Sequence, residues 1–239
     1  MTRKLGIETL ECRHVLATLV VTSVEDTIAS DGLVTLREAV IAANLDTIAD
    51  EMEGTQRGDG DDTIQFDPSL AGEAFALNAS LREITISSNL TIEGLGPEET
   101  TLQGGPYRFF VIDDEIDARL QVELKGMTLR ESRGTAIVSE EDLTLRQMKI
   151  VDNMLSEVVT SRGNLSIINS IVESNGRTNF SKIILQQGPH FESIDSEFRF
   201  NVGAAIGLIH HESASIVRST VSGNTGGCLL YTSPSPRDS

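Results

Sequence analysis

The sequence predicts an all-β protein in which one chain winds into a parallel β-helix behind a short capping helix. Three observations predict this fold. An apolar pattern recurs at steps of 21 to 26 residues in the second half of the chain. Aromatic residues make up only 4% of the chain, and its many Val, Ile, Thr, Asn and Gly residues favour short strands and tight turns. One amphipathic helical segment precedes the strand-like runs.

Five copies of one unit follow one another from Val122 onward. Each copy has a pair of mostly apolar residues two positions apart, a polar step and then a third apolar residue. Period-2 alternation turns one face of each strand inward, and a unit of about 22 residues buries that face only by stacking on its neighbours. The pairs begin at Val122, Leu143, Leu165, Phe191 and Ala214, and the third apolar residues are Leu129, Ile150, Val172, Phe198 and Val221.

Each unit ends on a polar residue, and four of these five end-points are asparagine. They are Ser132, Asn153, Asn175, Asn201 and Asn224, at steps of 21, 22, 26 and 23 residues. Asparagine tolerates left-handed backbone geometry at a sharp turn, and its amide bonds to the same residue of the next coil. We therefore expect a structural asparagine ladder; the alternative is that asparagine is simply common in loops.

A second apolar patch follows each of the first four end-points, so that each unit holds two or three short strands. Leucine-rich repeats share this period, but they need a helical half and a fuller leucine frame. A coil of about 21–26 residues in a β-helix fits better. The patches are Ala136–Val138, Val158–Val159, Ile183–Leu185 and 204–209.

The segment Asp31–Asn44 predicts a helix over residues 36–44. Thr35 and Glu38 have the spacing of a capping box, in which the two side chains satisfy free amides at the helix start. Leu36, Ala39, Val40 and Ala43 form one apolar stripe, and Asn44 is a suitable stop. So short a helix needs a surface to lie on, and we expect it to cover the open first coil of the solenoid.

Two segments carry a resemblance to bacterial surface proteins. Leu10–Ala17 resembles the "LEPR-xLL" sorting segment, with Cys12 where proline is usual, and Asp31–Asn44 resembles the "CSLREAI" region, with Val34-Thr35 in place of Cys-Ser. The resemblance covers roughly residues 5–227. It implies a right-handed single-stranded parallel β-helix with repeats of the polymorphic outer-membrane-protein type, whose first strands are residues 61–66 and 84–94, and it names no reaction.

The chain ends on a segment of different composition. Residues 228–239 resemble a translated sequencing-library adapter, so we interpret them as a non-native tail, and Cys12 remains as the single native cysteine. Three parts result: a sorting- or export-like segment (1–18), a β-helix domain with its capping helix (19–227), truncated at Gly227, and the tail. We expect a strand-like end at 228–232, disorder from Pro234 and self-association through the uncapped edge.

Charge excludes several partner classes. The chain carries 36 acidic and 19 basic residues, a net charge of −17. Such a surface repels nucleic-acid phosphates and anionic lipids, so we expect neither as a partner. No run approaches the roughly 18 apolar residues of a membrane-spanning helix. The charge and the sorting-like segment together predict a secreted or cell-surface protein.

One motif predicts a metal site. Gly58–Ile64 fits the calcium-binding nonapeptide pattern, in which Asp59, Asp61 and Asp62 supply the hard oxygen ligands that Ca²⁺ prefers. Such sites normally need tandem copies and the chain has one, so an acidic loop before a strand is the alternative. Calcium is the one cofactor that the sequence suggests.

Other polar groups indicate no coherent catalytic site. His190 and the His210-His211-Glu212 segment occupy turns of neighbouring coils and suggest either zinc ligands or a plain polar turn. Asp113-Asp114-Glu115, with Asp117, form a further acidic cluster. Arginines that would serve as a base do not share one repeat register; they are Arg130, Arg146, Arg199 and Arg218.

Two functions follow from these features. The first is a non-catalytic adhesin or extracellular-matrix scaffold that binds an extracellular polysaccharide or a surface protein. The second is a polysaccharide-binding or polysaccharide-degrading enzyme, a lyase or hydrolase, because a long β-helix face suits an extended polymer. A hydrolase needs two facing carboxylates about 5–10 Å apart, and the sequence alone identifies no such pair.

Overall fold

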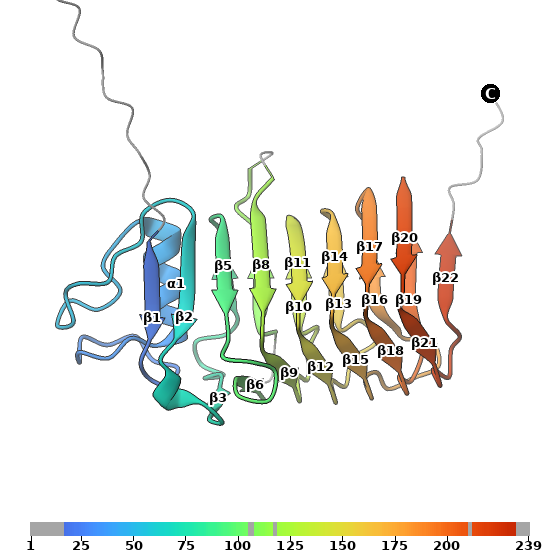
Figure 1. The fold of residues 1–239 in the computed structure, drawn as a ribbon, viewed down its shortest axis with the longest axis horizontal. Helices are drawn as coiled ribbons and strands as arrows, with labels where there is room; N and C mark the ends of the chain where they lie inside the picture. Colours follow the sequence, from blue (N-terminus) through green and yellow to red (C-terminus); the bar gives the residue numbers. More distant parts are fainter. Residues whose placement is uncertain (1–16, 105–107, 117–118, 210–211, 233–239) are drawn as a thin grey trace, which may run out of the picture.

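The computed structural model describes residues 17–104, 108–116, 119–209 and 212–232 of the 239-residue chain. Within these residues the chain winds through three strands per turn, and the strands of successive turns pair to form three sheets (Figure 1). The turns stack along the long axis of the molecule. The chain is therefore a parallel β-solenoid, as the repeat predicts, while the right hand of its winding stays a prediction.

From β2 onward each turn contributes one strand to each sheet, β1 adds an eighth strand to the first sheet, and all pairings within the sheets are parallel. The first sheet contains, in spatial order, β1 (Thr18–Val21), β2 (Asp62–Phe66), β5 (Leu90–Glu93), β8 (Gln121–Lys125), β11 (Asp142–Arg146), β14 (Leu165–Ile168), β17 (His190–Ile194) and β20 (Ser213–Val217). The second contains β3 (Ala74–Ala76), β6 (Thr101–Gln103), β9 (Thr128–Arg130), β12 (Lys149–Val151), β15 (Ile171–Glu173), β18 (Glu197–Arg199) and β21 (Thr220–Ser222). The third contains β4 (Ile84–Ile86), β7 (Phe110–Ile112), β10 (Ile137–Ser139), β13 (Val159–Ser161), β16 (Lys182–Gln186), β19 (Ala204–Ile209) and β22 (Leu229–Thr232).

The pairing register agrees with the alignment of the five repeats. In the first sheet Val122 pairs with Leu143, which pairs with Leu165, and the column continues to Phe191 and Ala214. The predicted apolar patches fall on or beside β10, β13, β16 and β19 of the third sheet. The second sheet aligns the third apolar residues in one column: Leu129, Ile150, Val172, Phe198 and Val221.

The core runs through the centre of the solenoid. Ile92, Leu124, Leu145 and Ile167 occupy one inward column of the first sheet and are fully buried. Burying each such side chain contributes roughly 1.5–3 kcal/mol. Because every inward column repeats this burial from turn to turn, the stacked units share one continuous core.

One predicted early strand is in fact two. Residues 84–94 form β4 and β5, which lie in the third and first sheets and are joined by a corner at Ser87–Asn89. The other predicted early strand, residues 61–66, appears as β2. The alternating pattern runs through the corner because both strands turn isoleucine or leucine inward, so sequence alone does not reveal the change of sheet.

The C-terminal turn is more exposed than the turns before it. All five residues of β20 are exposed, with Ile216 at 42% and Val217 at 38%. The predicted strand-like end is present as β22, which pairs with β19. Residues 1–16 and the segment from Pro234 lie outside the described residues, and edge-mediated self-association stays a prediction.

The capping helix α1 (Leu36–Leu45) begins as predicted. The Thr35 hydroxyl accepts a hydrogen bond from the Glu38 N–H, and the Glu38 carboxylate accepts one from the Thr35 N–H. The helix ends one residue later than predicted, because Asp46 rather than Asn44 adopts the left-handed conformation, with φ of 50°. Asn44 instead donates its amide to Thr85 O at 2.8 Å and so ties the helix to β4.

Helix α1 covers the first turn of the solenoid. Its apolar stripe is buried, and it contacts β1, β2 and β4; Figure 1 shows it beside β1 and β2. Strands β1 and β4 stand at the N-terminal ends of their sheets, so the helix lies where the next turn would otherwise stack. Among the described residues, no helix has the length and apolar character needed to cross a membrane.

A buried ion pair fastens this cap. The Arg37 guanidinium donates to both carboxylate oxygens of Asp26, at 2.6 and 2.9 Å, and to Glu83 O and Arg82 O beside β4. Both charged side chains are less than one tenth exposed. Asp26 also accepts the N–H of Asn78 at 2.7 Å. Helix, N-terminal loop and first turn therefore meet at one pair of charges.

Candidate functional site

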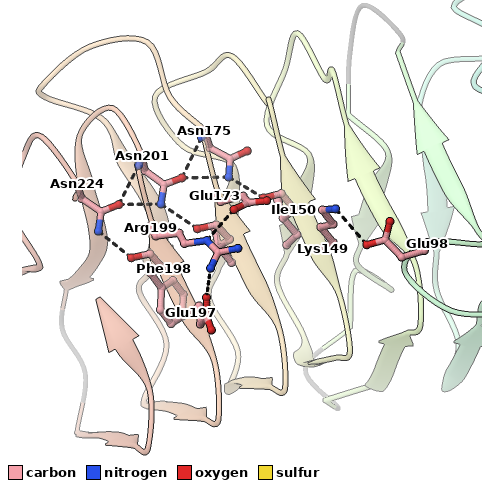
Figure 2. Close-up of polar contacts among 11 residues, drawn as sticks. Glu98, Lys149, Ile150, Glu173, Asn175, Glu197, Phe198, Arg199, Asn201 and Asn224 are labelled. Atoms are coloured by element: carbon pink, nitrogen blue, oxygen red, sulfur yellow. Dashed lines mark hydrogen bonds and ion pairs between the residues drawn. The ribbon is translucent and has the colours of Figure 1, made fainter. Parts of the chain in front are cut away.

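An asparagine ladder runs along one corner of the solenoid (Figure 2). The Asn175 side-chain oxygen accepts hydrogen bonds from the N–H and the amide of Asn153, both at 3.0 Å; Figure 2 shows the next rungs, from Asn175 to Asn224. Asn201 does the same for Asn175, and Asn224 does the same for Asn201. Ser132 begins the ladder by donating its N–H to Asn153.

Each ladder amide also reaches back into the sheet. Asn175 donates to Ile150 O at 2.8 Å, and Asn201 donates to Val172 O at 3.0 Å. Asn153, Asn175 and Asn201 are at most 1% exposed. Because these buried amides satisfy backbone groups of adjacent turns, the ladder sets the stacking register as well as the corner.

The left-handed conformation expected at these asparagines belongs instead to the residues before them. Glu131, Asp152, Ser174 and Phe200 have φ between 56° and 61°. The predicted turn role of asparagine is therefore wrong, although its ladder bonds are present. The asparagine side chain must point inward to reach its neighbours, so the preceding, solvent-facing residue makes the turn.

Phe200 is an unexpected residue in this turn column. The residue is 63% exposed, and positive φ is unfavourable for a bulky side chain. A Cβ added to Gly223 would lie 2.8 Å from the Phe200 ring. The ring thus rests against the glycine of the next turn and presents its other surface to solvent.

A second ladder, formed by serine, was missed by sequence reasoning. Ser170 accepts the Met148 N–H, Ser196 accepts the Ser170 N–H and Ser219 accepts the Ser196 N–H, at 3.0 to 3.2 Å. It lies at the corner between the first and second sheets. The signal was a serine after each strand of the first sheet in the last three turns, but serine is too common in loops to stand out.

Ion pairs lie along the outer surface and join different turns of the solenoid. Arg199 contacts Glu173 at 2.7 Å and also Glu197, and Lys149 contacts Glu98 at 3.1 Å (Figure 2). On the first sheet the Lys125 ammonium contacts Glu93 at 3.1 Å, and its hydrogen bond holds the pKa of that carboxyl below its usual value.

The four arginines do not form one outward row, as the sequence predicts, although two of them share a register position. Arg130 and Arg199 lie in the same column of the second sheet, three turns apart. Arg146 lies on the first sheet opposite Lys125, and Arg218 follows β20. The repeat alignment gives Arg130 and Arg199 the same place, two residues before the end-points Ser132 and Asn201.

The predicted calcium loop directs its carboxylates to separate partners. Asp62 is 2% exposed and accepts the Asp59 N–H at 3.0 Å; burial raises the pKa of its carboxyl. Asp61 instead accepts the amide of Asn89 at 2.8 Å. The loop thus anchors the start of β2, and its calcium binding stays a prediction.

The structure brings a different set of carboxylates together. One oxygen from each of Asp113, Asp114 and Glu141 lies within 4.8 Å of the others. The aspartates follow β7, and Glu141 precedes β11 on the next turn. Beside them is a cavity of about 400 Å³ lined by Asp113, Glu115, Ile116, Arg119, Glu140 and Glu141. Asp117 lies outside the described residues.

The histidine region forms a polar turn in its described part. His190 Nδ1 lies 2.8 Å from the Ser213 hydroxyl, and its Nε2 lies 3.9 Å from a Glu212 oxygen. His210 and His211 lie outside the described residues, so a zinc site here stays a prediction.

No family model, curated protein or solved structure matches the chain. A function is therefore inferred from the ladders, ion pairs and carboxylates of the solenoid itself.

Proposed function

We propose that this chain is a non-catalytic protein of the cell surface or extracellular space, and that it serves as an adhesion module or matrix scaffold. The asparagine ladder carries the proposal. It joins five consecutive turns through hydrogen bonds, of which all but the last are buried, and ion pairs join turns of the same stack outside. Such stacking favours a stiff rod with a long lateral surface. A rod of this kind can hold a binding surface away from the cell and offer an extended face to a partner.

Two further features support the location. The N-terminal segment and residues 31–44 resemble parts of bacterial surface proteins, and the net charge of −17 disfavours nucleic acids and anionic membranes as partners. An extracellular polysaccharide or a surface protein is the partner class that remains.

Incubation with acidic and neutral polysaccharides, with and without Ca²⁺, tests the proposal. We expect the length of every polymer to stay unchanged by size-exclusion chromatography, because the ladders perform a structural task. Reproducible chain cleavage that is lost on heat denaturation of the protein contradicts a non-catalytic role and favours the enzyme alternative.

Polysaccharide binding is the second candidate function, and the Phe200 ring favours it. An exposed aromatic face that is backed by a glycine offers a flat surface on which a sugar ring stacks. We expect affinity electrophoresis in a neutral polysaccharide to show retardation that Phe200→Ala weakens about 5–10-fold. Met154→Ala is the control, because Met154 is 54% exposed but does not lie on Gly223. Equal retardation of the two variants contradicts this role for Phe200.

A further inference from the structure

We propose that Phe180 and Phe200 form a two-ring platform that holds one chain of a neutral polysaccharide. The platform rests on the polysaccharide binding proposed for Phe200 and adds to it a second ring and a preference for an uncharged polymer. Phe180 is 92% exposed and Phe200 is 63% exposed. Both lie at the corner between the second and third sheets, which also carries the asparagine ladder (Figure 2), and they belong to consecutive turns.

The backbone that carries Phe180 is fixed, although its side chain is almost wholly exposed. The Ser181 N–H donates to Thr178 O at 2.9 Å and closes a β-turn with Asn179 and Phe180 at its tip. A ring that is already held in position loses little conformational freedom when a ligand binds to it. The turn therefore presents the ring ready for contact.

A second set of hydrogen bonds ties this turn to later parts of the solenoid. The Asn179 side-chain oxygen accepts the Thr225 hydroxyl at 2.9 Å, and Thr225 lies two turns further along the stack. The Thr225 oxygen in turn accepts the Gly203 N–H at 3.1 Å. Because Gly203 belongs to the same corner as Phe200, the loop with Phe180 is joined to the turn that carries the second ring.

The corner around the two rings is nearly free of charge. Residues 174–181, 200–203 and 223–227 include one charged residue, Arg177, whereas the whole chain has a net charge of −17. The rest of the surface therefore repels a polyanion, and the corner offers hydroxyl, amide and guanidinium groups that can form hydrogen bonds with sugar hydroxyls. This combination fits an uncharged polymer of sugars.

The same composition disfavours a protein partner. A protein interface has a contiguous apolar core, but the only large apolar residues in these corner segments are Phe180, Phe200 and Val202. Successive turns of a parallel sheet repeat at about 4.8 Å. A linear polymer that lies along the solenoid axis would therefore reach both rings and stack one sugar on each.

Affinity electrophoresis of the full chain in gels with hydroxyethyl cellulose, galactomannan or dextran tests the platform. We expect at least one of these polymers to retard the parent, and polygalacturonate to retard it less. Phe180→Ala should weaken the affinity about 5–10-fold, as Phe200→Ala does. Because each ring holds its own sugar, the double variant should lose about 25–100-fold. Adding NaCl should change the parent affinity by less than about twofold, because an uncharged ligand is not screened.

Met52→Ala is the matched control, because Met52 is 69% exposed but lies between α1 and β2. It should bind like the parent, and thermal melting should give the same Tm for Phe180→Ala as for the parent. If Phe200→Ala weakens binding and Phe180→Ala does not, the platform is wrong while binding through Phe200 stands. If no neutral polymer retards the parent, polysaccharide binding fails together with the platform. Stronger retardation by polygalacturonate than by every neutral polymer also overturns the proposal.

Discussion

Replacing Asn175 by leucine is expected to lower the free energy of unfolding by about 3–5 kcal/mol. The substitution preserves side-chain size but removes four hydrogen bonds of the ladder. The Asn153 N–H and the Ile150 carbonyl then lose their Asn175 partners in the interior, and each unsatisfied buried group costs about 1–3 kcal/mol. Urea unfolding followed by circular dichroism measures the change.

Asn224→Leu is the control for this prediction. Asn224 makes the same type of bonds to Asn201 but is only partly buried, at the last rung of the ladder. Water replaces its lost hydrogen bonds, so we expect a clearly smaller loss of stability. If both variants unfold at the urea midpoint of the parent, the ladder does not stabilise the stack.

Replacing Arg37 by methionine is expected to destabilise the protein by about 3–5 kcal/mol. The change leaves the Asp26 carboxylate buried without its cation and removes two bonds to the backbone beside β4. Because the pair lies at the capped end, the N-terminal turns should also become susceptible to protease before the rest. Urea unfolding and limited proteolysis with mapping of the first cleavage sites provide the measurements.

Two controls separate the buried charge from a general effect of losing arginine. Asp26→Leu in the Arg37→Met background removes the stranded carboxylate, and it should recover part of the lost stability. Arg218→Ala breaks the exposed Asp195–Arg218 pair, and we expect the urea midpoint to stay at the parent value. An Arg37→Met variant as stable as Arg218→Ala contradicts the role of the buried pair.

The fold was predictable where the repeat is regular. From Val122 to Asn224 the turns vary by only a few residues, so the alignment gave the correct pairing and the correct ladder partners. The earlier turns are longer: Leu90 pairs with Val122, which is 32 positions later. Long corners break the periodic signal there, and the resemblance rather than the repeat located β2, β4 and β5.

The sites were less predictable because they depend on contacts that occur once. Asp113 and Glu141 are 28 positions apart and meet only because β7 pairs with β10. The Arg37–Asp26 pair likewise depends on how the helix lies on the first turn. The Gly58–Ile64 motif, in contrast, is conspicuous in the sequence, yet Asp62 accepts a nearby backbone N–H and Asp61 accepts the amide of Asn89 on the next turn. Composition and spacing therefore predict features that recur in every turn, but they do not predict a contact that forms once between distant residues.

Double electron–electron resonance measures the register of the stacked turns most directly. The spin labels are attached to cysteines introduced at Thr91 and Ser215, in a variant in which Cys12 and Cys228 are replaced by serine. Thr91 and Ser215 lie five strand steps apart in one outward column of the first sheet. We expect their backbones to be about 24 Å apart. Moving the first label to Thr63, which pairs with Thr91, should add only about 5 Å although it adds 28 residues. Two narrow distance distributions that differ by about one strand spacing support the stacked register. Broad distributions, or a label-to-label distance that grows by much more than one strand spacing, contradict it.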